Sequence, residues 1–170
     1  NGCGKTTLLR CVTGLTRPDA GRITWLGQPV TEDPARFRGD IAYGGHLPGL
    51  KDDLTTEENL EFSLRLRDVA VDRDAIARAL VAVGLDKRRR LPARRLSAGQ
   101  RRRIGLARLS LDPALLWILD EPLTALDDAG QAHFVELLDR HLARGGLALV
   151  ATHHNLLPPS GKVRELRIAP

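Results

Sequence analysis

The first seven residues, Asn-Gly-Cys-Gly-Lys-Thr-Thr, are of the types that hold a phosphate group. They match the second half of the pattern G-x-x-x-x-G-K-[ST], in which glycines let backbone N–H groups turn inward onto an anion. Lys5 would place its charge against the β- and γ-phosphates of a nucleotide, and the Thr6 hydroxyl would be a ligand of Mg²⁺. The alternative is a glycine-rich turn that caps a helix and binds nothing. The residues predicted to contact the nucleotide are Asn1, Gly2, Cys3, Gly4, Lys5, Thr6 and Thr7, with Cys3 acting as loop backbone and not as a nucleophile.

The first glycine of this pattern would lie two residues before Asn1. The chain also contains no Met. We therefore expect the printed sequence to begin inside the loop, and the preceding residues to supply a strand and an aromatic side chain that stacks on adenine.

A pair of carboxylates follows the longest apolar run of the chain, Ala114 to Leu119. Such a run suits a central parallel strand, and ligands bind at the carboxyl ends of such strands. Asp120 would hold Mg²⁺ through water, and Glu121 would act as the general base that polarises an attacking water. The alternative is a pair of surface acids at a strand end. Six apolar residues in a row before the acids argue against such a surface ending.

The stretch Leu-Ser-Ala-Gly-Gln at 96–100 reads as the start of a helix whose free N–H groups face an anion. Ser97 can donate its hydroxyl, and Gly99 leaves the backbone open to close approach. The alternative is a helix N-cap without any ligand.

Strands and helices alternate around these motifs, which predicts a layered α/β core. Helical spacing occurs over 5–12, 56–67, 72–84, 98–110 and 129–144, and strand patterns occur over 21–30 (a hairpin), 40–45, 114–119, 147–152 and 163–168. Residues 47–95 carry helices without strands, so we expect a helical insertion there, within a single domain over 1–170.

Composition excludes several classes of protein. A hydrophobic fraction of 42% is ordinary for a globular domain, and the longest apolar run is far too short to cross a bilayer. Cys3 and Cys11 match no zinc spacing or disulfide framework, which favours a reducing, cytoplasmic setting. The chain has no C-x-x-C-H, so we expect no covalent haem.

The net charge is +5, and nine Lys or Arg lie between Lys87 and Arg103. Three interpretations stay open: a nucleic-acid surface, attraction to an anionic membrane, or a solvated face.

Taken together and in this order, the motifs resemble those of the ATP-binding subunits of ABC (ATP-binding cassette) transporters. Asn1–Thr7 is similar to their Walker A loop, 96–100 to their signature, 116–122 to Walker B, 123–127 to the D-loop and 151–154 to the switch histidine. The resemblance implies a P-loop NTPase fold, ATP and Mg²⁺ as ligands, and ATP sandwiched between two head-to-tail subunits. It also implies that His153 clamps the γ-phosphate, that Asp127 bridges the dimer, and that Ser97, Gly99 and Gln100 contact the ATP held by the partner.

A narrower resemblance, carried by 41–60, 96–109 and 115–127, is to the haem-exporter ATP-binding subunits of the cytochrome c maturation system. It implies integral-membrane permease partners, a peripheral place on the cytoplasmic face of the bacterial inner membrane, and ATP hydrolysis coupled to release of haem-loaded chaperone. Most ABC ATPases have Gln where this chain has His46. Since Mg²⁺ prefers oxygen ligands, we predict that His46 acts through water or as a contact to the membrane partner; the alternative is a surface loop histidine. We assign no role to His133, His141 or His154.

Other functions compete with this one. The chain could serve another ABC exporter or importer, or be a soluble ABC-type ATPase acting on nucleic acid through its arginine cluster. A nucleotide-binding module without turnover is a further possibility. The nucleic-acid families carry long insertions between the phosphate loop and the signature, and this chain has none, so we expect no direct nucleic-acid partner.

Overall fold

A parallel sheet forms the centre of the protein. The computed structural model describes residues 4–154, 156, 158–159, 161–166 and 168. Within them, three strands pair in the order β3–β4–β5, with bounds Ile41–Gly44, Leu116–Asp120 and Leu147–Ala151. Residue 116 lies opposite both 41 and 147, so the three carboxyl ends reach the same edge of the sheet.

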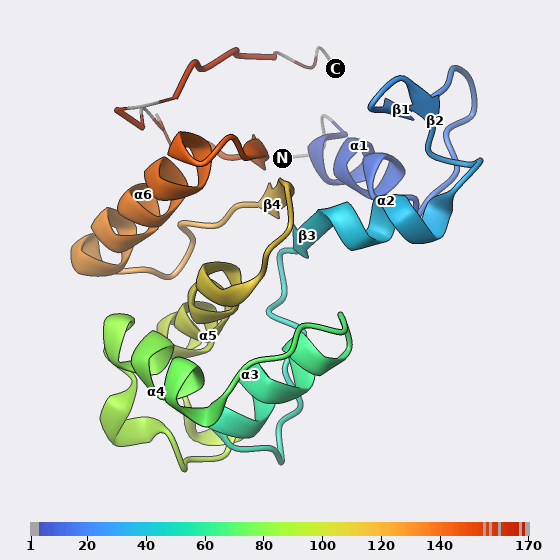
Figure 1. Cartoon of the computed structure of the whole chain (residues 1–170). Coiled ribbons are helices and arrows are strands. Elements are labelled where there is room, and N and C mark those ends of the chain that lie inside the picture. Colours follow the sequence, from blue (N-terminus) through green and yellow to red (C-terminus); the bar gives the residue numbers. More distant parts are fainter. Residues whose placement is uncertain (1–3, 155, 157, 160, 167, 169–170) are drawn as a thin grey trace.

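Side chains of β4 alternate between two apolar layers. Leu116 and Ile118 pack with Leu9 and Phe37, which come from helices α1 (Lys5–Val12) and α2 (Pro34–Asp40). Trp117 and Leu119 point to the opposite face, where helices α5 (Ala98–Leu111) and α6 (Asp128–Ala143) cover the sheet (Figure 1). Every residue of β4 is buried because it has a strand on each side and a helical layer on each face. The predicted layered α/β class is confirmed.

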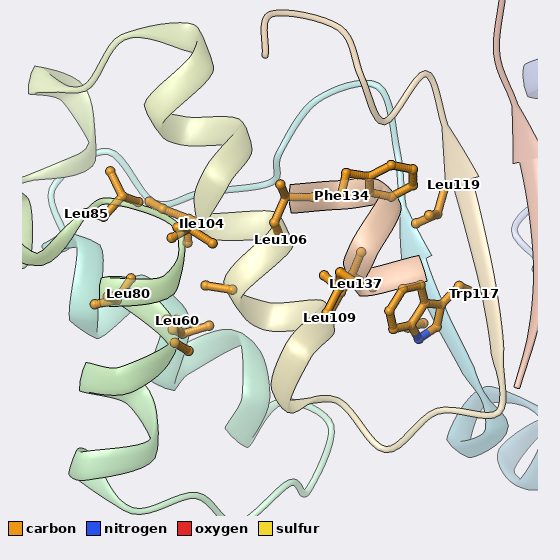
Figure 2. Close-up of a cluster of buried hydrophobic side chains, with 14 of the residues drawn as sticks. Leu60, Leu80, Leu85, Ile104, Leu106, Leu109, Trp117, Leu119, Phe134 and Leu137 are labelled. Carbon is orange, nitrogen blue, oxygen red and sulfur yellow. The ribbon is translucent and has the colours of Figure 1, made fainter. Parts of the chain in front are cut away.

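Two further helices, α3 (Thr56–Arg65) and α4 (Arg73–Ala82), pack beside α5 on the side away from α1 and the hairpin (Figure 1). Their buried residues are spaced by four, as one helix face requires: Leu60 with Leu64, and Ile76 with Leu80. Helix α5 joins this group to the sheet, because its side chains contact both parts of one continuous apolar cluster (Figure 2). Two short 3₁₀ turns, Asp86–Arg88 and Ala93–Arg95, occupy the predicted basic linker. The division at 47–95 as a separate subdomain stays a prediction.

The remaining predicted elements have mixed outcomes. The hairpin is confirmed as β1 (Thr24–Trp25) and β2 (Gln28–Pro29), paired antiparallel. The predicted strand over 163–168 is wrong for the described residues 163–166 and 168, which have no strand partner; Val163 and Leu166 are exposed, so no neighbouring surface holds this segment in a sheet. Strand β5 is only partly buried, since β4 is its one neighbour among the described strands. In the part of the chain that the structure describes, no helix combines the length and apolar character needed to cross a bilayer.

One histidine is part of the core. The His141 ring is 5% exposed and stacks on the Trp117 indole, with ring centroids 3.9 Å apart and planes 9° from parallel. Its Nε2 lies 3.0 Å from the carbonyl oxygen of Leu147 and donates to it. Gly146 is required beside it, because a Cβ atom there would lie 2.3 Å from the ring. His141 therefore fixes the turn between α6 and β5, a structural role that its sequence position does not reveal.

Burial makes this histidine a source of acid sensitivity. Desolvation, with a smaller contribution from the charge of Arg144, lowers the pKa of His141 below its ordinary value. The unfolded chain then binds more protons than the folded one as pH falls below about 6.5, so stability decreases in that range. We expect His141→Phe to flatten the pH dependence of the free energy of unfolding between pH 7 and 5, by at most about 1.4 kcal/mol per pH unit.

The measurement is urea unfolding of the intact protein at several pH values. His154→Ala, which removes an exposed ring, is the control and should keep the slope of the parent protein. Equal slopes for His141→Phe and the parent would show that His141 does not carry this sensitivity.

Candidate active site

The side chain of Asp120 points toward helix α1 because of the alternation along β4. It lies two residues after Ile118, on the face that packs against Leu9, and Thr6 comes one turn before Leu9 on α1. The Thr6 hydroxyl donates to the Asp120 carboxylate at 2.8 Å, and Asp120 is 3% exposed. The two residues predicted as Mg²⁺ ligands are thus in direct contact.

A second group of three side chains meets beside this pair. The Lys5 Nζ atom lies 3.6 Å from Glu121 Oε1 and 3.0 Å from His153 Nε2, and the same Nε2 lies 3.3 Å from Glu121 Oε1. The three residues come from the start of α1, the end of β4 and the loop after β5. Because adjacent parallel strands end at one edge of the sheet, residues more than 100 positions apart converge there.

The backbone of Glu121 makes an abrupt turn after the strand. Its N–H donates to the Ala151 carbonyl at 2.8 Å, which extends the β4–β5 pairing by one bond. Its φ of 48° lies in the left-handed region, which is costly for a residue with a Cβ atom. Its carbonyl accepts from the guanidinium of Arg102 on α5, a contact that the sequence analysis missed.

The start of α1 is open to an anion among the described residues. Gly4 precedes the helix at φ 84°, its position has no side-chain cap, and no acidic residue occupies the first turn. Free N–H groups and the positive end of the helix dipole are therefore available next to Lys5. Asn1, Gly2 and Cys3 lie outside the described residues, and Thr7 is exposed.

The signature-like stretch forms the start of α5 by a reciprocal cap. Ser97 Oγ accepts from the Gln100 N–H at 3.2 Å, and Gln100 Oε1 accepts from the Ser97 N–H at 3.1 Å. Gly99 lies against the backbone of the following loop, since a Cβ atom there would be 2.5 Å from the Ala125 carbonyl oxygen. The glycine thus permits contact between two of the predicted motifs.

Asp127 caps helix α6. It accepts from the Gly130 N–H at 3.0 Å and also from Arg103, and these bonds lower the pKa of its carboxyl group, with the backbone bond as the larger cause.

Other predicted residues do not join the Lys5 group. Ser97, Gly99 and Gln100 have no hydrogen bond to it within the described ranges. His46 is exposed, and no described residue pairs with its imidazole, although its carbonyl accepts from Arg102. Among the described residues there is also no cluster of three or more His, Cys, Asp or Glu that could hold a metal ion alone.

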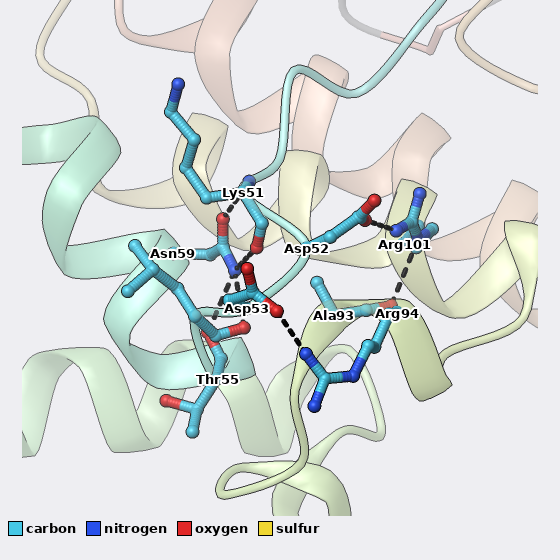
Figure 3. A network of polar contacts seen from close by, with 9 residues as sticks. Lys51, Asp52, Asp53, Thr55, Asn59, Ala93, Arg94 and Arg101 are labelled. Atoms are coloured by element: carbon cyan, nitrogen blue, oxygen red, sulfur yellow. Dashed lines mark hydrogen bonds and ion pairs between the residues drawn. The ribbon is translucent and has the colours of Figure 1, made fainter.

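The basic run is partly neutralised by carboxylates. Pairs join Arg89 to Glu57, Arg94 to Asp53, Arg101 to Asp52 and Arg103 to Asp127. Figure 3 shows two of these pairs beside Asn59, whose amide hydrogen-bonds to Lys51 and to two further backbone carbonyls and so orders the 51–55 loop. Much of the run therefore holds the helical part together, which weakens the nucleic-acid interpretation.

Comparison with known proteins agrees with this arrangement. Residues 1–124 match the ABC transporter family. The chain is 48% identical over 98% of its length to the cytochrome c biogenesis ATP-binding export protein CcmA 2 of Cupriavidus metallidurans, of which it covers 78%. It is 48% identical over 99% of its length to the CcmA protein of Methylococcus capsulatus, of which it covers 81%.

Solved structures are similar as well. An ABC transporter ATP-binding protein from Pyrococcus furiosus superposes with a TM-score of 0.77 at 27% identity, over 91% of this chain and 76% of that one. A dimeric ATP-binding cassette with bound ADP and Pi superposes with a TM-score of 0.78 at 24% identity, over 90% of this chain and 71% of that one, which supports the fold alone.

The close approach at Gly99 can be tested by two matched substitutions on the same helix. Gly99→Ala should lower the free energy of unfolding by about 1–3 kcal/mol, because the 123–127 loop must shift to admit a methyl group. Gly105→Ala has open space around its Cβ position and should stabilise α5 by about 0.5–1 kcal/mol through helix propensity. Urea unfolding measures both, and a Gly99→Ala variant as stable as Gly105→Ala would contradict the predicted clash.

Proposed function

This chain belongs to the ABC transporter family and, within it, to the cytochrome c biogenesis ATP-binding export proteins, and on that premise we propose that it hydrolyses ATP to drive a haem-export complex. The observation that carries the proposal is the convergence of Lys5, Glu121 and His153 next to the Thr6–Asp120 pair. A cation, a carboxylate and an imidazole within 3.6 Å of one another are the groups that phosphoryl transfer to water needs.

The triphosphate would bind at the start of α1. Lys5 would place its ammonium against the β- and γ-phosphates. The uncapped N–H groups of the first turn would donate to oxygens of the α- and β-phosphates, with Gly4 allowing the turn. In the structure, the Lys5 ammonium contacts Glu121 and His153. In this binding mode it would contact phosphate oxygens instead.

The residues present fit a Mg²⁺ ion. A hydroxyl and a carboxylate 2.8 Å apart are hard oxygen donors, and Mg²⁺ is usually held by one or two such groups together with phosphate oxygens and water. Thr6 and Asp120 would hold the ion, with Asp120 acting through water. When bound, Mg²⁺ would neutralise charge on the β- and γ-phosphates.

Glu121 and His153 would act on the attacking water. Glu121 is only 17% exposed on its side chain, and as a carboxylate it would accept a proton from the water as the oxygen attacks the γ-phosphorus and ADP leaves. The ring of His153 is more exposed, at 61%, and would orient the water or the γ-phosphate by a hydrogen bond. The 3.3 Å contact between His153 and Glu121 would keep the carboxylate directed at the reacting centre.

The second half of the site would come from a second subunit. Ser97 is exposed and Gly99 and Gln100 are half-buried at the start of α5, and none of the three binds the Lys5 group of its own chain within the described residues. In a head-to-tail pair they would contact the γ-phosphate held by the partner, and Asp127 would lie at the interface.

The haem-export assignment rests on the relatives, whose names give cytochrome c biogenesis export as their role. Integral-membrane permease subunits would then be the partners, at the cytoplasmic face of the inner membrane. The loop after β3 presents exposed His46 and Leu47, the latter 80% exposed, and would form part of that contact. Within this role His46 stays a predicted water-mediated or mechanical contact.

The role of Glu121 is tested by Glu121→Gln in the complete protein. This variant should bind ATP, accumulate as an ATP-bound dimer, and lose turnover by about 100-fold or more, since an amide cannot accept the proton. Steady-state ATPase rates and size-exclusion chromatography with ATP measure the two effects. Lys5→Ala is the contrasting variant and should weaken nucleotide binding itself. An undiminished rate for Glu121→Gln would remove it from the base role.

The transport assignment is tested in cells. Replacing the chromosomal copy by the Glu121→Gln variant should abolish the c-type cytochromes seen by haem staining while the b-type haem signal persists. Unchanged c-type cytochromes would contradict the haem-export role but not the ATPase role.

Duplex DNA added to the purified ATPase should leave its rate unchanged, and strong stimulation would favour the nucleic-acid alternative.

A further inference from the structure

One arginine of helix α5 binds the ends of two strands. We call α5 the signature helix, because it begins at the signature-like stretch 96–100. Arg102 lies in the second turn of α5, five residues after Ser97. Its Nη1 donates to the carbonyls of Gly45 at 3.0 Å and His46 at 3.3 Å. Its Nη2 donates to the carbonyls of Asp120 at 3.0 Å and of Glu121. A single guanidinium therefore contacts four backbone carbonyls, one at the end of β4 and three in the loops after β3 and β4.

The position of these carbonyls explains why an arginine suits this place. They lie at the end of β4 and just after β3 and β4, which are neighbours in the sheet, where the strand pairing ends. A planar guanidinium presents several donors in a fixed fork and can serve both loops at once, which a lysine ammonium cannot do with the same geometry. Burial lowers the pKa of Arg102, and the nearby carboxylates of Asp120 and Glu121 oppose that change because they favour the charged guanidinium.

The burial of Arg102 has a cost as well as a benefit to folding, so stability alone does not explain why an arginine lies here. The Arg102 Nε atom is buried without a hydrogen-bond partner in the described structure, which is a cost to folding. Glu121 is held at φ 48°, a backbone conformation that persists only where surrounding contacts fix it. Three hydrogen bonds hold its backbone here: its N–H donates to the Ala151 carbonyl, and its carbonyl accepts from the Thr124 N–H at 3.2 Å and from Arg102. Of these, the Arg102 bond is the one that comes from α5.

We propose that Arg102 is a positioning residue that couples the signature helix to the catalytic carboxylate of Glu121 and to the His46 loop. A displacement of α5, on which Ser97 to Gln100 face the second subunit, would then move the backbone of the general base and of the predicted contact to the membrane partner together. The inference rests on the proposed function, since it takes Glu121 as the base.

Arg101 provides a matched control on the same helix. It also bonds through its guanidinium, but to the Asp52 carboxylate and to the Ala93 carbonyl at 3.0 Å, so it contacts neither strand end (Figure 3). Arg101→Gln thus removes two guanidinium bonds from α5, one of them to a carboxylate, without touching Glu121 or the His46 loop.

The experiment compares Arg102→Gln, Arg102→Lys and Arg101→Gln in the complete protein, by ATPase kinetics and equilibrium binding of a non-hydrolysable ATP analogue. We expect Arg102→Gln to lower kcat by about 10- to 100-fold, the scale of a small misplacement of a reacting group, with KM and analogue binding unchanged. Arg102→Lys should lower kcat as well, because it keeps the charge and loses the fork. Arg101→Gln should keep the kcat of the parent protein.

Two further readouts separate positioning from a merely structural role. Guanidinium ion added at low millimolar concentration should raise kcat of Arg102→Gly and leave the parent protein unaffected. In the Glu121→Gln background, Arg102→Gln should cause no further loss of the residual rate, because both act through one carboxylate. If Arg102→Gln does not fold, Arg102→Lys and the same double-mutant comparison carry the test.

A parent-like kcat in the folded Arg102 variants would overturn the inference. It would also be overturned if Arg102→Gln lowered kcat by the same factor in the parent protein and in the Glu121→Gln background. These outcomes differ from failure of the proposed function. An inactive parent protein would refute ATP hydrolysis as the function, and a fully active Glu121→Gln variant would refute the role of Glu121 as the base.

Discussion

The parallel register of β4 with its two neighbours is the constraint on which the site depends. Because side chains alternate along a strand, this register sends Trp117 and Leu119 to the layer of α5 and α6, and Ile118 and Asp120 to the layer of α1. A slip of one residue would turn Asp120 away from Thr6 and bury its carboxylate against the helices of the other layer. The apolar residues of β4 therefore determine where the Asp120 carboxylate lies, and they do so by burial on both faces.

Helix α5 connects the parts of the molecule that the proposed function requires to act together. Its first turn carries the capped Ser97–Gln100 stretch, and Gly99 lies against the loop that leads to Asp127. Further along, Arg102 bonds to the two strand ends, while the apolar face of the helix packs on both the sheet and the helices α3 and α4 (Figure 2). A helix held in this way transmits displacement because packed contacts and hydrogen bonds along it resist independent movement of its neighbours.

Much of this arrangement could be predicted from sequence, for physical reasons that differ between residues. Strand β4 was predictable because an unbroken apolar run followed by acids suits few other environments. The start of α5 was predictable because Ser97 and Gln100 form a capping pair. Helix α2 was missed although Asp33 before Pro34 is a start signal, because its one buried residue, Phe37, makes no periodic apolar face.

The role of Arg102 could not be predicted, because Arg101, Arg102 and Arg103 are chemically identical and only their angles around α5 distinguish them. Those angles matter only once the tertiary structure shows which side of the helix meets the strand ends. The structural role of His141 could not be predicted for the same reason, because it depends on stacking against the Trp117 indole, a contact that only the tertiary structure shows.

The central claim is that the triphosphate binds where α1 meets the carboxyl ends of β4 and β5. A crystal structure of the complete protein with Mg²⁺ and a non-hydrolysable ATP analogue tests it most directly. We predict the γ-phosphate within hydrogen-bonding distance of Lys5 Nζ and His153 Nε2, with Mg²⁺ at the Thr6 hydroxyl and Asp120. A nucleotide bound elsewhere, with the Lys5–Glu121 and Thr6–Asp120 contacts still intact, would contradict the account.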